Sequence, residues 1–172
     1  SCEMPTALTI SDVLDVSVKL NLIDSPSSPT DGYAYFLSTS NIEPSLNEIP
    51  TGIVPFGTTF TTLNGLTPGT NYYVWLRALC SPTSKSYWTD VVMFKTLCSP
   101  IPTFSENFDT YLTGAANPLP LCWDKGGTVS NVYITNGSVS PATAPNRLYM
   151  AGYPTLTPPA YTYAAMPYTT NI

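Results

Sequence analysis

The sequence contains no histidine and little charge. Among its 172 residues there are six Lys and Arg and eleven Asp and Glu, so that 10% of the residues are charged and the formal net charge is −5. Without histidine, the chain lacks the commonest general base and the commonest zinc ligand. The scarcity of basic residues argues against a phosphate-binding surface, and we therefore expect no nucleic-acid partner.

Long apolar runs are also missing. No stretch approaches the roughly 18 apolar residues that a membrane helix needs, so we expect no membrane span. The 18 prolines and 10 glycines are spread along the chain and leave no long helical pattern. The opening residues, SCEMPTALTI, have neither a basic start nor an apolar core, which indicates that any targeting peptide has been removed or lies elsewhere.

Four cysteines are present: Cys2, Cys80, Cys98 and Cys122. Their wide spacing fits no metal knuckle, because no two of them are close neighbours in the sequence. An even number of cysteines, together with little charge and many Ser, Thr and Tyr residues, is typical of a disulfide-bonded protein outside the cytoplasm. We therefore predict a secreted or cell-surface protein in which all four cysteines form disulfides.

Short apolar-alternating segments separated by turn signals dominate the first half of the chain. Apolar and polar residues alternate over residues 15–23, which indicates a half-buried strand. Further strands are predicted at YAYFLST, TFTTLN and YWTDVVMFKT, and the Pro- and Gly-rich segment EIPTGIVPFGTT suits an edge strand. About six or seven strands without a helix predict an antiparallel sandwich.

The segment LTPGTNYYVWLRA, residues 66–78, resembles the E–F corner and F strand of a fibronectin type III module. The resemblance extends over residues 5–96, and YWTDVVMFKT resembles the G strand of such a module. It implies that Tyr72 is the tyrosine-corner residue, with its hydroxyl bound to the backbone just upstream. The B strand departs from the family because it lacks the usual core Trp, and Leu20 or Leu22 is expected to fill that space.

The wider pattern of RALC, Trp88, FKTLC, ENFD and CW resembles secreted multidomain proteins of Bacteroidetes-type bacteria. In those proteins fibronectin modules stand beside MAM-like jelly-roll domains, and many leave the cell by type IX secretion. The resemblance implies an all-β chain: a fibronectin type III (immunoglobulin-like) β-sandwich over residues 1–97, followed by a partial β jelly roll over residues 98–172. Because the second part covers only half of such a domain, we expect a fragment of a longer protein.

Within residues 98–172, the side chains expected in the jelly-roll core are those of Phe104, Phe108 and Trp123. NVYITNGSVS predicts a hairpin with a two-residue turn at Asn136-Gly137. NRLYMAGY predicts a further strand.

The implied sandwich also selects a disulfide pairing. Strand F runs toward the pole where strand A begins, so Cys80 is expected near Cys2. Cys98 follows strand G at the opposite pole, about 25 Å from Cys80 at about 3.3 Å per residue. Since a bridge needs Cα atoms within about 7 Å, we predict the pairs Cys2–Cys80 and Cys98–Cys122.

Alternation along the predicted F strand places Tyr72, Val74, Leu76 and Ala78 inward. The side chains expected together on the outer face of the sheet are those of Phe36, Tyr73, Trp75, Arg77 and Met93. We predict that they form an exposed apolar patch, which normally marks an interaction surface, here for a neighbouring domain or another protein subunit. The alternative is that these side chains only pair across strands.

The candidate acidic site consists of Glu106 and Asp109, with Asp124 nearby in the sequence. Glycoside hydrolysis needs two carboxyls about 5–9 Å apart across a cleft, whereas Glu106 and Asp109 are expected on opposite faces of one strand. No histidine can activate a serine. We therefore predict that the chain is not an enzyme and has no cofactor. Solvated loop acids are the favoured interpretation of Glu106 and Asp109, and a structural calcium site is the alternative.

Together these features indicate a non-enzymatic adhesive or structural module of a larger secreted or cell-surface protein, with surface polysaccharide as a candidate ligand. One alternative is the accessory, spacer or carbohydrate-binding region of a large secreted hydrolase. Another is a subunit of a surface filament that is completed by strand exchange.

Overall fold

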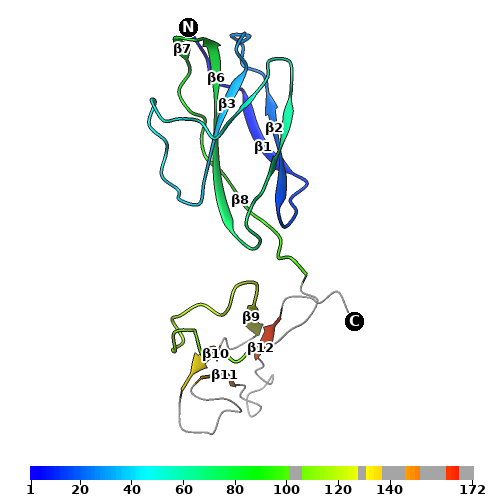
Figure 1. Cartoon of the computed structure of the whole chain (residues 1–172), viewed down its shortest axis with the longest axis vertical. Coiled ribbons are helices and arrows are strands. Elements are labelled where there is room, and N and C mark those ends of the chain that lie inside the picture. The colour runs from blue at the N-terminus through cyan, green and yellow to red at the C-terminus, as the bar shows by residue number, and fades with distance from the viewer. Residues whose placement is uncertain (101–105, 128–130, 137–145, 152–161, 167–172) are drawn as a thin grey trace. The chain divides into compact units, whose positions relative to one another are not determined.

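The computed structural model describes residues 1–100, 106–127, 131–136, 146–151 and 162–166 (Figure 1). The chain divides into two compact units, Ser1–Cys98 and Ser99–Ile172. In the described ranges every regular element is a β-strand, labelled β1 to β12. The all-β class predicted from the sequence is therefore confirmed.

One sheet of the first unit is three-stranded, with the antiparallel order β1-β2-β5. Its strands are β1 (Ala7–Ser11), β2 (Ser17–Ile23) and β5 (Phe60–Asn64). In β2 the side chains of Val18, Leu20 and Leu22 are buried, and the residues between them are half-buried. The predicted alternation is confirmed. Leu20 and Leu22 both lie in the hydrophobic core, and β2 contains no Trp.

The second sheet of the first unit is five-stranded and has the order β4-β3-β6-β7, with β8 also paired to β6. Its strands are β3 (Tyr33–Ser38), β4 (Gly52–Val54), β6 (Asn71–Ser81), β7 (Ser84–Lys85) and β8 (Val92–Lys95). β4 is an edge strand, as Gly52 and the flanking Pro50 and Pro55 predict. β8 is shorter than the predicted G strand, because the regular ladder with β6 begins only at Val92. Before it, Thr89 is bound to Leu76 of β6, donating its N–H to the carbonyl at 2.8 Å and accepting the N–H on its hydroxyl at 3.1 Å.

The two sheets face each other across one hydrophobic core (Figure 1). The four residues of β6 predicted to point inward, Tyr72, Val74, Leu76 and Ala78, all lie in this core. Because β6 is central in its sheet and the smaller sheet has β2 at its centre, the first unit is a fibronectin type III-like β-sandwich. This part of the predicted fold is confirmed.

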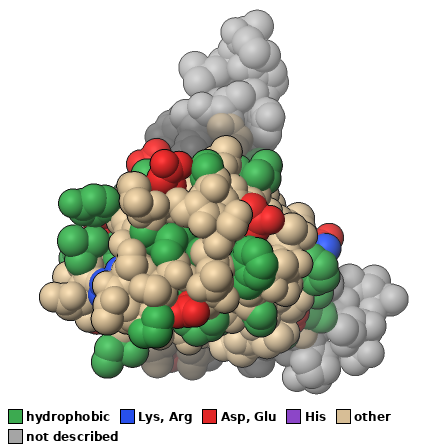
Figure 2. All heavy atoms as spheres, turned by 90° about the horizontal axis from the view of Figure 1, so that it is seen from above, with side chains coloured by type: hydrophobic (Ala, Val, Ile, Leu, Met, Phe, Trp, Pro, Cys, Tyr) green, Lys and Arg blue, Asp and Glu red, His purple; other side chains and the backbone are tan. Residues whose placement is uncertain are grey.

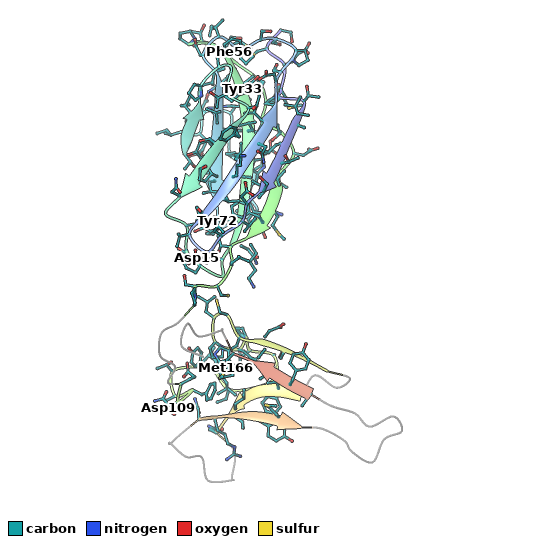
Figure 3. The ribbon with its side chains drawn as sticks, turned by 90° about the vertical axis from the view of Figure 1, so that its right-hand side faces the viewer. Asp15, Tyr33, Phe56, Tyr72, Asp109 and Met166 are labelled. Carbon is teal, nitrogen blue, oxygen red and sulfur yellow. A yellow bond between two sulfur atoms is a disulfide. The ribbon has the colours of Figure 1, made fainter. Side chains whose placement is uncertain are left out.

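Two buried tyrosines tie loops to opposite halves of the sandwich (Figure 3). The Tyr72 hydroxyl accepts a hydrogen bond from the backbone N–H of Thr67 at 2.9 Å, which confirms the tyrosine corner. Near the other end, the Tyr33 hydroxyl donates to Asp24 Oδ1 at 2.9 Å and accepts from the N–H of Ser25 at 2.9 Å. Each phenol thus satisfies backbone groups at the point where the chain leaves a strand.

The predicted bridge between Cys2 and Cys80 is present, with the two Cα atoms 5.9 Å apart. It joins the start of the chain to the end of β6. Cys98 and Cys122 are also disulfide-bonded, and no cysteine is free.

The second unit contributes two antiparallel strand pairs. β9 (Asp124–Gly127) pairs with β12 (Thr162–Ala165), and β10 (Asn131–Thr135) pairs with β11 (Arg147–Ala151). The strands predicted at NVYIT and NRLYMAGY are therefore present. The predicted core residue Phe104 and the predicted turn at Asn136-Gly137 fall, wholly or in part, outside the described residues.

The strand predicted at Glu106–Asp109 is wrong. The Glu106 carboxylate accepts a hydrogen bond from the N–H of Phe108 at 2.7 Å, and the Asn107 side chain accepts one from the N–H of Asp109 at 3.2 Å. Phe108 has a φ of 63°. Side chains that bond to nearby backbone N–H groups in this way compete with the sheet ladder and favour a turn.

Removal of the Cys2–Cys80 bridge should destabilise the first unit. We expect the double variant Cys2→Ser, Cys80→Ser to lose about 2–4 kcal/mol of unfolding free energy, since the bridge closes a loop with a sequence separation of 78. Urea denaturation of the full chain measures the loss. Non-reduced peptide mapping should recover a Cys98–Cys122 peptide pair from this variant and from the parent, and a Cys80–Cys98 pair in the parent would contradict the assignment.

Alkaline pH should weaken the contribution of Tyr33 to the free energy of unfolding of the first unit. Burial raises the pKa of the Tyr33 phenol above its ordinary value; the hydrogen bond from Ser25 opposes this, and the hydrogen bond to Asp24 and the charge of Asp24 act in the same direction as burial. The protonated phenol therefore stabilises the fold fully below pH of about 10, and this stabilisation is lost as the pH rises through the folded-state pKa. The difference in unfolding free energy between the parent and Tyr33→Phe should be constant up to that pH and shrink above it. A difference that stays level in urea titrations at higher pH would contradict this.

Candidate functional site

The outer face of the β3-β6-β8 sheet is largely covered by the chain itself. Trp75 is 2% exposed and Arg77 is 3% exposed. The predicted exposure of this face is therefore wrong for these two residues. Phe36 and Tyr73 are half-buried, and Met93, at 59% exposed, is the one member of the predicted patch that faces solvent.

The cover consists of Trp88 and of residues 39–51, which connect β3 to β4. Arg77 Nη1 donates to the carbonyl of Leu46 at 2.7 Å, and Nη2 donates to the carbonyl of Glu48 at 3.2 Å. The guanidinium lies over the Trp88 ring, 4.1 Å from its centroid. Trp88 Nε1 in turn donates to the carbonyl of Ser45 at 3.1 Å. We call this arrangement the Arg77 clamp.

The Arg77 clamp closes a second, small hydrophobic core on the outer face. The Phe36 ring lies 6.1 Å from that of Trp75 and 6.3 Å from that of Trp88, measured between centroids. Ala34 lies buried in the same cluster. Tilted aromatic contacts of this kind add to the stabilisation from area burial.

Burial lowers the pKa of the Arg77 guanidinium from its ordinary value, but the group remains a cation at physiological pH. Its charge is compensated by two carbonyl dipoles and by the Trp88 ring. The Nε hydrogen is buried and has no partner. The guanidinium is therefore a structural group that holds residues 45–48 against the sheet.

Holding residues 45–48 against the sheet leaves a groove beside β7. The backbone carbonyls of this turn face the sheet, so that Leu46 and Asn47 form one wall of the groove. Residues 83–87, which include β7, form the other wall. We call this hollow, of about 370 Å³, the hairpin groove.

The candidate acidic residues Glu106 and Asp109 are both half-buried and bound within their own unit. The Glu106 carboxylate also accepts from the Tyr111 hydroxyl at 3.2 Å, and burial together with this carboxylate raises the pKa of Tyr111. Asp109 Oδ1 accepts from the N–H of Asn146 at 3.1 Å. In the described part of the chain, no group of three or more His, Cys, Asp or Glu side chains lies close enough to hold a metal ion.

Phe108 and Trp123, both predicted for the core of the second part, do meet. Their rings are in edge-to-face contact, with centroids 5.4 Å apart. Asp124 lies exposed at the start of β9, where it accepts from the N–H of Lys125 at 2.8 Å. The acids near this contact thus bond to backbone groups rather than facing one another across a cleft.

Among the described residues, no helix has the length and apolarity to cross a membrane. No protein-family model and no curated protein matches the chain.

Several solved structures resemble the chain over its first part. The fibronectin type III domain of human fibronectin type III domain containing protein 3 is 22% identical over 58% of this chain and 90% of that chain, with a TM-score of 0.44. The chicken CNTN1 FN1–FN3 domains are 15% identical over 56% of this chain and 31% of that one, with a TM-score of 0.43. A myokine structure is 22% identical over 56% and 99%, with a TM-score of 0.44.

The fibronectin type III-like class of the first unit rests on its strand order and on the bond between Tyr72 and Thr67. The disulfides of the chain are typical of a protein that functions outside the cell.

The sequence predicted the correct sheet face for Trp75 and Arg77, but it did not predict that Trp88 and residues 39–51 cover that face. The hydrogen bonds that hold residues 45–48 against the sheet are accepted by backbone carbonyls. Every residue has a carbonyl, so the residue types in 39–51 do not predict these bonds. The available signal was the combination of a single Arg, two Trp residues and an unusually long connection on one sheet face.

Truncation of the Arg77 clamp should destabilise the first unit. We expect Arg77→Ala to lower the free energy of unfolding by about 3 kcal/mol, because two carbonyls lose their donor and the Trp88 ring loses its contact. Tryptophan emission should also shift to longer wavelength as Trp88 becomes hydrated. Lys95→Ala, at an exposed position of β8, is the control and should change stability by less than about 0.5 kcal/mol. Equal urea midpoints for Arg77→Ala and the control would contradict the clamp.

Proposed function

We propose that the chain is a non-catalytic part of an extracellular protein, and that its first unit is a rigid spacer that orients the domains beside it. The observation that carries this proposal is the closure of the outer sheet face by the Arg77 clamp. Because the chain itself covers the outer face of the β3-β6-β8 sheet, the first unit needs no docked neighbour to bury Trp75 and Arg77. It suits a module that separates its neighbours, and the exposed Met93 remains on this face as a contact point.

The Cys2–Cys80 bridge supports the same role. It ties the first residues of the chain to the end of β6, the central strand, so that tension applied at the start of the chain passes through the bridge and leaves the enclosed loop unloaded. Disulfides form and persist in oxidising compartments. We therefore place the protein among secreted or surface-attached proteins.

For the second unit we propose the N-terminal part of a MAM-like jelly roll with an adhesive role. The contact between Phe108 and Trp123 and the two antiparallel strand pairs support an antiparallel β domain. Export by the type IX route, and assembly with neighbouring domains or other subunits, belong to the same proposal.

A spacer that works under tension should lengthen little while its bridge is intact. In single-molecule pulling of the full chain by its two ends, unfolding of the oxidised first unit should release only residues outside the bridged loop. Reduction should add the loop, with a separation of 78 residues, which corresponds to roughly 260–280 Å of extra extension. The variant Cys98→Ser, Cys122→Ser is the matched control and should keep the short oxidised step. Equal steps before and after reduction would contradict the proposed role of the bridge.

A further inference from the structure

We propose that the hairpin groove binds a saccharide that carries a carboxylate group. This deepens the proposed function and rests on it, because extracellular modules meet polysaccharides. The groove's volume of about 370 Å³ lies at the lower end of the range of about 300–1,000 Å³ for small-molecule sites. Its lining combines an exposed aromatic ring, amide and hydroxyl groups, and one ammonium group.

The first wall of the groove is held in place by the protein. The N–H of Glu48 donates to the carbonyl of Ser45 at 3.0 Å and closes a turn. The Arg77 clamp fixes the carbonyls of residues 45, 46 and 48 against the sheet. Asn47, at the tip of this turn, is exposed and lines the groove.

The second wall is held by the short hairpin between β6 and β7. Lys85 pairs with Leu79 across this hairpin. The Ser86 side chain is buried, accepts from the N–H of Ala78 at 2.9 Å and donates to the carbonyl of Tyr87 at 2.7 Å. Both walls are therefore ordered before a ligand arrives, which reduces the entropic cost of binding.

The chemistry of the exposed groups matches a sugar. Tyr87 is 70% exposed and offers its ring to the apolar face of a pyranose. The Asn47 amide and the hydroxyls of Thr83 and Ser84 line the same hollow and can exchange hydrogen bonds with sugar hydroxyls. Aromatic stacking combined with convergent neutral hydrogen-bonding groups suits a ligand with both apolar faces and many hydroxyls.

Lys85 selects the carboxylate. No Asp or Glu lines the groove, and within the described residues Lys85 Nζ has neither an ion pair nor a hydrogen bond. The chain has only six basic residues and a net charge of −5, and Lys85 is the one basic residue that lines this groove. Figure 2, viewed from the end of the first unit where β7 lies, shows only small areas of basic side chains. An ammonium gains most from a charged acceptor.

Two other occupants fit less well. A nucleic acid would meet one lysine on a protein of net negative charge, which supplies too little phosphate neutralisation. An apolar peptide would leave the amide and hydroxyl groups of the groove without partners, at a cost in desolvation. The acidic saccharide satisfies the ring, the neutral groups and the ammonium together.

The test uses the full oxidised chain and two probes, a galacturonate trisaccharide and its methyl ester, which keeps the sugar rings and removes the charge. Isothermal titration should show binding of the acid and several-fold weaker binding of the ester. Lys85→Gln should weaken binding of the acid about three- to ten-fold and leave the ester unchanged. Tyr87→Ala should weaken both about ten-fold. Lys95→Gln, on β8 and outside the groove, is the matched control and should bind as the parent does.

Three results would overturn the proposal: no binding of either probe, equal binding of acid and ester, or binding that neither groove variant weakens. Thermal melts of each variant ensure that a loss of binding is not a loss of folding. Failure here leaves the pulling experiment untouched, because the length released by the first unit does not depend on the groove. A short oxidised step without saccharide binding would therefore retain the spacer and reject the ligand.

Discussion

The contact between Arg77, the Trp88 ring and the carbonyls of Leu46 and Glu48 organises the outer half of the first unit. A buried cation needs compensation, and this one obtains it from an aromatic ring and two backbone dipoles. As a consequence, residues 39–51 cannot leave the sheet without removing the carbonyl partners of the Arg77 guanidinium. The same contact therefore decides that the sheet face is closed and that a groove opens beside β7.

The inner half follows a simpler rule. β6 places every second side chain between the sheets, and Tyr72 and Tyr33 add hydrogen bonds that fix a loop in each half of the sandwich. The Cys2–Cys80 bridge then ties the start of the chain to the end of β6. These contacts fix loops and the start of the chain to the same core.

The candidate sites were predicted unevenly, according to whether a local sequence pattern reveals the contacts that form them. The Cys2–Cys80 pair followed from strand directions, which alternation and the corner motif reveal. Glu106 and Asp109 were placed on a strand, but their carboxylates bond to nearby N–H groups and to Asn146, so the segment turns instead. The sequence did not predict the hairpin groove, because its walls come from residues 46–47 and 83–87, which no local sequence pattern connects.

The sequence by itself determined the β class, the alternation of β2 and β6, the tyrosine corner and the oxidised cysteines. The alternation and the tyrosine corner depend on residue type at short spacing, since a pleated strand turns every second side chain to the same face. The oxidised cysteines follow instead from their even number and from the composition of the chain. Tertiary structure alone decided what covers Trp75 and Arg77 and where a groove remains. Those outcomes rest on bonds to main-chain carbonyls from distant side chains, and a carbonyl is the same in every residue.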